Sequence, residues 1–246
     1  AMALHPLNYA LGIANAAAAA GVRIFENSRV SGYTRSDPAI VSTAKGSVKA
    51  AHVVLGCNGY LGDLEPRSAG KIMPINNFMV ATQPLGEERA LELINGRFGV
   101  HDTRFVVNYF RLSDDYRLLF GGGENYRPGF PRDIERFVRP YMLRMFPQLK
   151  DVNIDYAWGG TLAVTVNRLP HVGRLEPNVY FAQGYSGHGI STATFAGKVI
   201  AEAIAGVAGR FDGLASLPTH TFPGGTHLRY PGMVLGMLYY GIKDRF

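Results

Sequence analysis

The sequence predicts an α/β fold at both ends of the chain and an α+β arrangement in the middle. Residues 8–56 suggest a helix followed by strands, and residues 179–205 suggest a strand, a glycine turn and a helix. Between them lie strand patterns, polar turns and one long amphipathic helix. With 246 residues, 47% of them hydrophobic and 18% charged, the chain can bury a sizeable core. One domain interrupted by another fits this order better than two domains in tandem.

The first part predicts a βα-type unit that lacks its first strand. Residues 8–20 favour a helix, and Gly21 is placed to cap its C-terminus. Residues 22–35 alternate apolar and polar side chains, which is typical of a half-buried strand. Residues 39–56 predict a hairpin that turns at Lys45-Gly46 and leads into a buried strand at 53–55.

The middle part carries the antiparallel pattern. We expect a strand within residues 74–84, a short helix within 86–96, and two strands within 104–122 joined at Ser113-Asp114-Asp115. Residues 131–147 predict an amphipathic helix, and residues 154–164 a further strand. The apolar positions of that helix are Ile134, Phe137, Val138, Tyr141, Met142 and Met145.

Three glycines, Gly184, Gly187 and Gly189, separate an apolar run at 179–182 from an amphipathic helix at about 191–205. A helix N-terminus has unpartnered N–H groups and a positive dipole end, and glycine lets a ligand approach the backbone. The pattern therefore fits a site for an anion or a polar ring edge. It equally fits an ordinary strand-turn-helix corner.

Charge and cysteine content exclude several classes of protein. The net charge of +6 suggests nucleic-acid binding, but the basic residues are scattered, which argues against it. An anionic cofactor or substrate would explain the positive excess equally well. The single cysteine, Cys57, lies in an apolar run; it excludes an internal disulfide and favours a buried thiol. The seven histidines show no spacing typical of a metal site.

We expect a cytoplasmic protein. The start of the chain lacks a cationic signal-peptide region, and no apolar run approaches the roughly 20 residues of a membrane span. Residues 231–246 are apolar for about a dozen positions, which is too short to span. They could pack on the body of the protein or dock on a partner or a membrane surface.

Four motifs resemble one family when taken in order. They are HPLNYALGIANAAAAAGVRIFENSRV, AAHVVLGCNGYLG, WGGTLAVTVNRLPHVG and AQGYSGHGISTATFAGKVIAEAI. This order is similar to that of FAD-dependent amine oxidases of the D-amino-acid oxidase and sarcosine oxidase superfamily. The ending FPGGTHLRYPGMVLGMLYYGIKDRF more narrowly resembles the gamma-glutamylputrescine oxidase branch.

The resemblance implies a partial Rossmann-like FAD-binding domain interrupted by an antiparallel-sheet substrate domain. The FAD-binding part would comprise residues 1–72 and 161–210, the substrate domain 73–160, and a C-terminal tail 211–246. The G-x-G-x-x-G fingerprint for the FAD pyrophosphate is absent from the sequence. We therefore expect a C-terminal fragment of a longer enzyme, which self-associates through surface left open. The alternative is a folded, non-catalytic remnant unable to bind FAD.

The resemblance also implies the chemistry and the cofactor contacts. Hydride passes from the carbon next to the substrate amine to the flavin, and the resulting imine is hydrolysed. The flavin ring edge would lie against Gly187, His188, Gly189 and Ile190. The other implied FAD contacts are Val30 at the adenine, Asn58 and Gly59 in a turn, and Gly160, Thr161 and Arg168 beside the flavin. Val30 is also expected as a core valine on a strand, which is compatible with a contact through its backbone. Asn58-Gly59 could equally be a plain turn, and Arg168 could instead be a surface cation.

The middle sheet is expected to cover the flavin face and to bind the substrate. Tyr109 and Arg111 point to the same side of a strand by its period of two. Such a pair suits an anionic amine substrate such as a gamma-glutamyl amine, or it forms a solvated strand face. His188 could orient a water or tune the flavin, and Trp158 could line the pocket; a turn histidine and a core tryptophan are the structural alternatives.

Overall fold

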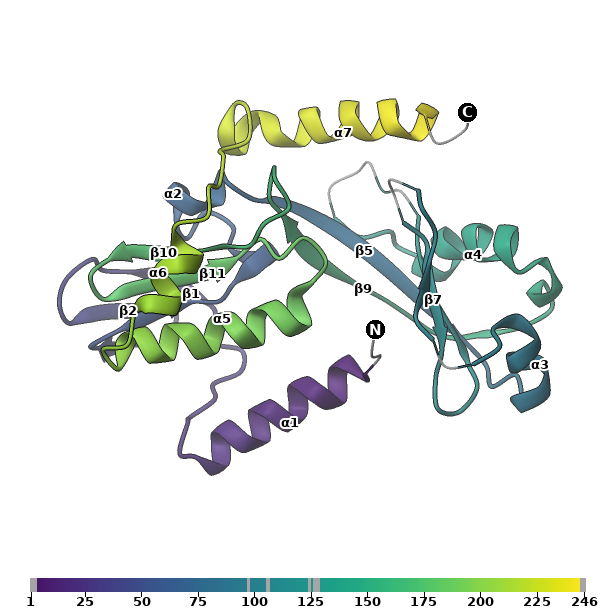
Figure 1. The fold of residues 1–246 in the computed structure, drawn as a ribbon, viewed down its shortest axis with the longest axis horizontal. Helices are drawn as coiled ribbons and strands as arrows, with labels where there is room; N and C mark the ends of the chain where they lie inside the picture. The colour runs from purple at the N-terminus through teal and green to yellow at the C-terminus, as the bar shows by residue number, and fades with distance from the viewer. Residues whose placement is uncertain (1–3, 97, 105–106, 124, 126–128, 244–246) are drawn as a thin grey trace. The chain divides into compact units, whose positions relative to one another are not determined.

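The chain folds into two compact units, each built from more than one segment. The computed structural model describes residues 4–96, 98–104, 107–123, 125 and 129–243. One unit, here called the antiparallel unit, comprises Ala1–Leu4, Asn76–Thr161 and Pro231–Phe246. The other, the α/β unit, comprises His5–Ile75 and Leu162–Tyr230. The unit boundary falls within two long strands, β5 (Met73–Thr82) and β9 (Ile154–Val164) (Figure 1).

A five-stranded sheet in the order β6-β7-β8-β5-β9 forms the frame of the antiparallel unit. Its remaining elements are β6 (Val100–His101), β7 (Tyr109–Leu112), β8 (Leu118–Gly121), α3 (Glu87–Leu93), α4 (Ile134–Met145) and a 3-10 turn, η2 (Pro147–Leu149). The pairs β6–β7, β7–β8 and β8–β5 are antiparallel. The predicted strands, the turn at residues 113–115 and both helices are therefore confirmed, whereas β6 was not predicted.

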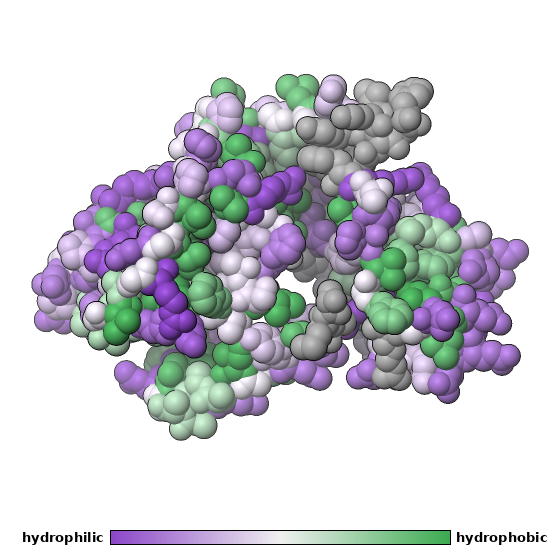
Figure 2. Space-filling view, viewed as in Figure 1, coloured by the Kyte–Doolittle hydropathy of each residue, from purple (hydrophilic) through white to green (hydrophobic). Residues whose placement is uncertain are grey.

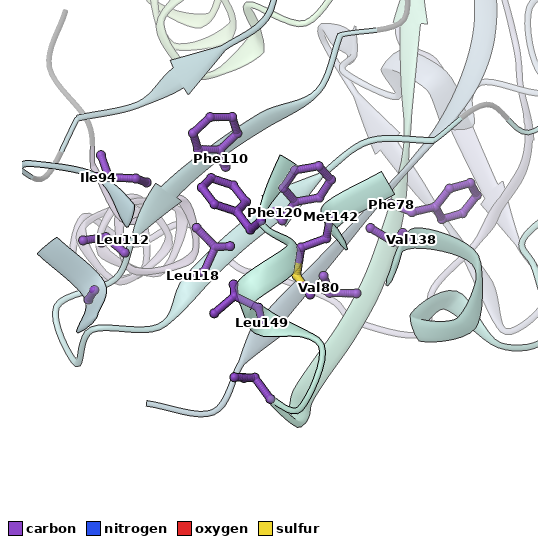
Figure 3. Packing of buried hydrophobic residues seen from close by; sticks show 13 residues of the cluster. Phe78, Val80, Ile94, Phe110, Leu112, Leu118, Phe120, Val138, Met142 and Leu149 are labelled. Carbon is purple, nitrogen blue, oxygen red and sulfur yellow. The ribbon is translucent and has the colours of Figure 1, made fainter. Parts of the chain in front are cut away.

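Aromatic rings fill the core between this sheet and α4 (Figure 3). The rings of Phe110 and Phe120 stack with centroids 6.1 Å apart, and the ring of Phe146 meets Phe110 edge-on at 5.0 Å. Alternate residues of β7 and β8 point into this core, as the period of two requires. The opposite face of β7 is left to Tyr109 and Arg111, which are half-buried.

The predicted apolar stripe of α4 is confirmed for five of its six positions. Val138 and Met142 are buried, and Ile134, Phe137 and Tyr141 pack against the same core. Met145, in the last turn, is 37% exposed. The Asp133 carboxylate caps the helix by accepting from the Arg136 backbone N–H at 2.8 Å.

Three layers build the α/β unit around a sheet in the order β10-β11-β4. Its strands are β1 (Val30–Tyr33), β2 (Ala39–Thr43), β3 (Gly46–Ala50), β4 (Val53–Leu55), β10 (His171–Glu176) and β11 (Val179–Gln183). Its helical elements are α1 (Pro6–Ala19), η1 (Asn58–Tyr60), α2 (Pro66–Ala69), α5 (Gly189–Ile204) and α6 (Gly209–Ala215). Strand β11 runs parallel to β4 and antiparallel to β10.

Helices and a second sheet cover opposite faces of this central sheet. On one face, buried residues of β10 and β11 pack with α5 and with Phe211 of α6. On the other, Val53, Leu55 and Phe181 pack with Ala39 of the antiparallel sheet β1-β2-β3. The predicted fold class, α/β with an antiparallel middle, is confirmed.

Strand β4 is buried on one face only. It is the edge strand of its sheet, and Val54 is 48% exposed between buried Val53 and Leu55. The prediction of a buried strand therefore holds for one of its two faces.

Residues 22–29 form no strand, which corrects the prediction for 22–35. Only Val30–Tyr33 is extended and paired, and Val22, Ile24 and Phe25 are 54%, 56% and 67% exposed. The alternation shows where an apolar face lies, but a strand also needs a neighbour to accept its backbone hydrogen bonds. In the same region the hairpin turn consists of Ala44-Lys45, since Gly46 already pairs with Thr43.

Helix α1 matches its predicted position, and Gly21 after it has φ +90°. Within the described residues α1 buries no side chain. Leu7, Leu11 and Ile13 are 61%, 52% and 46% exposed, and hydrophobic residues gather on the surface over α1 at the bottom of Figure 2.

The C-terminal segment forms α7 (Gly225–Lys243), which was not predicted as a helix. Within the α/β unit, the Arg229 guanidinium donates to the backbone carbonyls of Ile72, at 2.8 Å, and Ala69. No helix among the described residues is long and apolar enough to cross a membrane.

Candidate functional site

The turn that joins β11 to α5, residues 184–189, is here called the glycine turn. Gly184 and Gly187 have φ +70° and +94°, and Ser186 between them has φ +51°. A Cβ at Gly184 would lie 2.5 Å from Thr165 Cγ2, so this position needs glycine for space as well as for conformation. Apart from its two chain neighbours, no described residue has an atom within 4 Å of a Cβ built at Gly187. The first glycine serves packing, whereas the second faces open space.

Two other segments hold the glycine turn in place, one through a side chain and one through its backbone. The Asn58 amide oxygen accepts from the Gly184 backbone N–H at 3.0 Å, so η1 is joined to the turn. Asn58 itself has φ +46°, a conformation that asparagine tolerates better than most residues. The backbone N–H of Ser186 donates to the Ala163 carbonyl at 3.0 Å, and the Ser186 hydroxyl accepts from the Thr165 N–H at 3.3 Å. The turn is therefore fixed before any ligand binds.

The N-terminus of α5 is open. His188 occupies the N-cap position, but its side chain makes no capping hydrogen bond, and the first turn contains no acidic residue. The N–H groups of the first three helical residues have no intrahelical acceptor. This end of the helix is accessible, because the side chain of the N-cap residue His188 is exposed and that of Ile190 is 46% exposed. Such an end accepts an oxygen or nitrogen atom that carries partial negative charge.

Arg168 lies in a tight turn that begins at Thr165. Its backbone N–H donates to the Thr165 carbonyl at 3.3 Å, its φ is +65°, and its side chain is exposed. The Thr165 hydroxyl closes this turn by donating to the Leu169 carbonyl at 2.7 Å. Because Thr165 also contacts Ser186, the Arg168 turn adjoins the glycine turn.

The structure thus brings several predicted residues together in the α/β unit. Asn58, the glycine turn and the Arg168 turn are joined by hydrogen bonds, and Gly59 is buried beside Asn58. Val30 lies instead in the sheet β1-β2-β3, where it is half-buried and pairs with Thr43.

In the antiparallel unit, Tyr109 crosses strand β8 to reach β5. Its hydroxyl donates to the Asn77 side-chain oxygen, and its ring covers Gly121, which pairs with Tyr109 in the sheet. Burial raises the pKa of the Tyr109 hydroxyl to about 12, so it stays protonated at neutral pH. Arg111 lies two residues further along the same strand face.

The other predicted residues of this unit lie on β9. Trp158 is 42% exposed in the described structure, so it does not belong to the core. Gly160 and Thr161 are half-buried, and the Thr161 hydroxyl donates to Asn76 Oδ1 at 2.8 Å.

Sequence reasoning missed the asparagines that hold these side chains. Asn76 and Asn77 lie in the middle of β5, where asparagine is depleted. Two adjacent asparagines inside a predicted strand were the available signal for them.

Two predicted properties concern reactive groups. Cys57 is half-buried, and burial raises the pKa of its thiol, which makes it less reactive. The described residues contain no group of three or more His, Cys, Asp or Glu side chains that could hold a metal ion.

A three-layer α/β unit in which a fixed glycine turn leads into an open helix end is typical of a site for an anionic or polar cofactor group. The chain belongs to the FAD dependent oxidoreductase family, whose model matches residues 1–203. FAD is the cofactor of this family.

The chain is also similar in sequence to individual oxidoreductases. The chain is 45% identical over 243 residues to gamma-glutamylputrescine oxidoreductase of Escherichia coli and covers 98% of its own length and 57% of that protein's. It is 39% identical to a probable oxidoreductase OrdL of Rhizobium meliloti, covering 99% of this chain and 56% of that protein. The chain therefore spans somewhat more than half the length of these relatives.

Among solved structures, glycine oxidase from Geobacillus kaustophilus superposes with a TM-score of 0.70 at 19% identity. The match covers 87% of this chain and 58% of that one. At this identity the likeness concerns the fold alone.

Proposed function

We propose that the chain forms the flavin-ring and substrate-binding part of an FAD-dependent amine oxidoreductase. The observation that carries this proposal is the open N-terminus of α5 behind a glycine turn fixed by Asn58. When bound, FAD supplies the acceptor for the hydride that leaves the carbon next to the substrate nitrogen.

The residues of the α/β unit fit the flavin ring edge. Gly187, Gly189 and Ile190 offer backbone N–H groups, and no carboxylate lies in the first turn of α5. The His188 N–H already donates to the Tyr185 carbonyl at 2.9 Å, so His188 would contribute its side chain. These groups would stabilise negative charge on the ring edge when electrons arrive, and the turn needs no rearrangement to do so. Asn58 acts by holding the turn, with Gly59 buried next to it, and Arg168 would add a positive charge near the turn. Val30 would contact the adenine through its backbone.

The residues of the antiparallel unit fit an anionic amine. Tyr109 and Arg111 share one half-buried strand face, and Arg111 offers the planar donor pair that binds a carboxylate. Trp158 would line the same binding region from β9, whereas Gly160 and Thr161, further along that strand, would contact the flavin. We propose a gamma-glutamyl amine as substrate, because the Escherichia coli relative is named for gamma-glutamylputrescine.

This assignment divides the chain as the sequence suggested. Residues 1–72 and 161–210 would contact FAD, residues 73–160 the substrate, and 211–246 would form a tail. A cytoplasmic location and self-association remain proposals. The exposed apolar side chains of α1, residues 22–25 and Val54 support self-association, since such surface favours burial against another protein surface.

The test is a titration of the folded chain with FAD, followed by quenching of flavin fluorescence. Ser191, exposed in the first turn of α5, offers a matched pair of variants. Ser191→Glu places a carboxylate at the open helix end, where it suits the helix dipole but competes with the flavin edge. We expect binding at least about 10-fold weaker than for Ser191→Gln, which has the same shape without the charge.

Two outcomes would contradict the proposal. Equal FAD affinity of the two variants would place the flavin away from α5. A chain that is folded by circular dichroism and binds no FAD would favour the non-catalytic alternative. If FAD binds, oxidation of gamma-glutamylputrescine by the chain and by Arg111→Gln tests the substrate, with a raised KM expected for the variant.

A further inference from the structure

A separate pocket of about 430 Å³ opens in the α/β unit at the outer edge of β10. Strand β10 and helix α6 form its walls, and Lys71 and the residues after α6 complete it. This volume is within the range of small-molecule sites. The polar side chains that line it are Lys71, His171, Arg174, Asp212 and Thr219.

Two of these side chains are cations for which the described part of the chain provides no carboxylate partner. Among the described residues, no ion pair involves Lys71 or Arg174. Arg174 lies over the rings of Tyr180 and Phe211, 4.8 Å and 5.5 Å from their centroids. This stacking orients the guanidinium and leaves its N–H groups available. With Asp212 as the one carboxylate of the described lining, the pocket carries a net positive charge.

Thr219 provides an independent sign of a missing partner. Its hydroxyl oxygen is buried and has no hydrogen-bond partner among the described residues. A buried hydroxyl without a partner is costly, and native structures rarely keep one without a reason. Strand β10 adds donors, because an edge strand has backbone N–H groups that face away from its neighbour.

His171 offers one more donor at neutral pH. Its Nδ1 lies 3.1 Å from Gln183 Nε2, and the same amide donates to the Ser68 carbonyl at 3.0 Å. Because Gln183 acts as the donor in both bonds, His171 accepts at Nδ1 and carries its proton on Nε2.

We propose that this pocket binds a small molecule through an oxyanion group, a carboxylate or a phosphate. Lys71 and Arg174 supply the charge, and Thr219, His171 and the edge of β10 supply hydrogen bonds. Phe211 provides an apolar wall for the rest of the ligand. The proposal is independent of flavin binding, since none of these residues belongs to the glycine turn.

Calorimetric titration of the whole chain with potassium phosphate and with potassium succinate tests the proposal, in potassium chloride of constant ionic strength. Lys71→Gln should weaken binding at least about 10-fold, since a charge-assisted hydrogen bond is lost. The matched control is Lys49→Gln on β3, which removes the same charge from an exposed position outside the pocket. It should leave affinity within about twofold.

Thr219→Val separates binding from folding. The variant removes an unpartnered hydroxyl, so the melting temperature without ligand should stay equal or rise while binding weakens. Preference for phosphate or for succinate identifies the oxyanion, and either supports the site. The proposal is overturned if the folded chain binds neither anion, or if Lys49→Gln weakens binding as much as Lys71→Gln.

Discussion

Similar apolar side chains are buried in the core of the antiparallel unit and exposed in segment 5–29 of the α/β unit. Phe120 and Leu118 are fully buried between the five-stranded sheet and the helices that cover it. Leu7 and Phe25 are 61% and 67% exposed. Both regions have periodic apolar patterns. In the antiparallel unit, however, the strands pair with one another and helices of the same unit cover the sheet.

The difference shows what periodicity can and cannot predict. A pattern identifies which side chains share a face, because it depends on local backbone geometry. Whether that face is buried depends on a partner surface that the local pattern does not encode. Val54 makes the same point inside one strand, since it is exposed where Val53 and Leu55 beside it are buried.

The largest contrast is expected from truncating an aromatic ring in each region. Phe120→Ala should lower the free energy of unfolding by about 3–5 kcal/mol, since the ring is fully buried and its loss leaves a cavity. Phe25→Ala should change it by less than about 0.5 kcal/mol. Urea denaturation followed by circular dichroism measures both. A cost above about 2 kcal/mol for Phe25→Ala would mean that segment 5–29 is buried in solution.

Adding a methyl group should change the free energy of unfolding in opposite directions in the two regions. At Gly121 a Cβ would collide with the Tyr109 ring, so Gly121→Ala should cost about 1–3 kcal/mol. At Gly12, inside α1, no described residue outside the helix's own backbone lies within 4 Å of a Cβ. Gly12→Ala should therefore stabilise the helix by up to about 1 kcal/mol, as helix propensity predicts. Thermal melts of the two variants provide the comparison, and destabilisation by Gly12→Ala would reveal a close neighbour of α1.

Much of the fold could be predicted because its signals are local. The amphipathic stripe of α4, the Ser113–Asp115 turn and the strand before the glycine turn are all encoded within a few residues. Strand β10 was missed, although it pairs with β11 along its whole length. Its sequence HVGRLE has weak alternation and a glycine that serves the close packing of Phe181, which is a tertiary requirement.

The candidate site was less predictable, because hydrogen bonds between distant segments define it. The glycines and Asn58 were predicted from motif order, but nothing in the sequence joins Asn58 to Gly184 across 126 residues. The bond from Tyr109 to Asn77 is likewise a product of sheet order, since β8 lies between their strands. The sequence motifs therefore predicted which residue types the site contains, whereas the topology of the fold determines which of them are joined by hydrogen bonds.

Acid should destabilise the α/β unit through a buried base. Burial and the charge of Lys71 lower the pKa of His171 to about 4, below its usual value of 6.5. Because the unfolded chain then binds a proton that the folded chain does not, stability is constant above about pH 6.5 and falls towards pH 4. The expected loss by pH 5 is about 2 kcal/mol.

His171→Gln tests this origin, since glutamine cannot titrate. Urea denaturation between pH 5 and pH 7.5 should give a flatter dependence for the variant than for the parent chain. A slope unchanged by the substitution would assign the acid sensitivity to other groups.

The smallest effect is expected where α1 contacts the rest of its unit. The Tyr9 and Thr194 hydroxyls share a hydrogen bond of 2.9 Å in an exposed position, and α1 buries no side chain among the described residues. An exposed bond of this kind exchanges readily with water, so Tyr9→Phe should cost less than about 0.5 kcal/mol of global stability. It should instead speed hydrogen exchange and proteolysis within α1, because local opening depends on few contacts. If hydrogen exchange in α1 stays unchanged while global stability falls, the helix unfolds only together with the whole unit. Segment 5–29 would then differ from the aromatic core in its exposure to solvent and not in its stability.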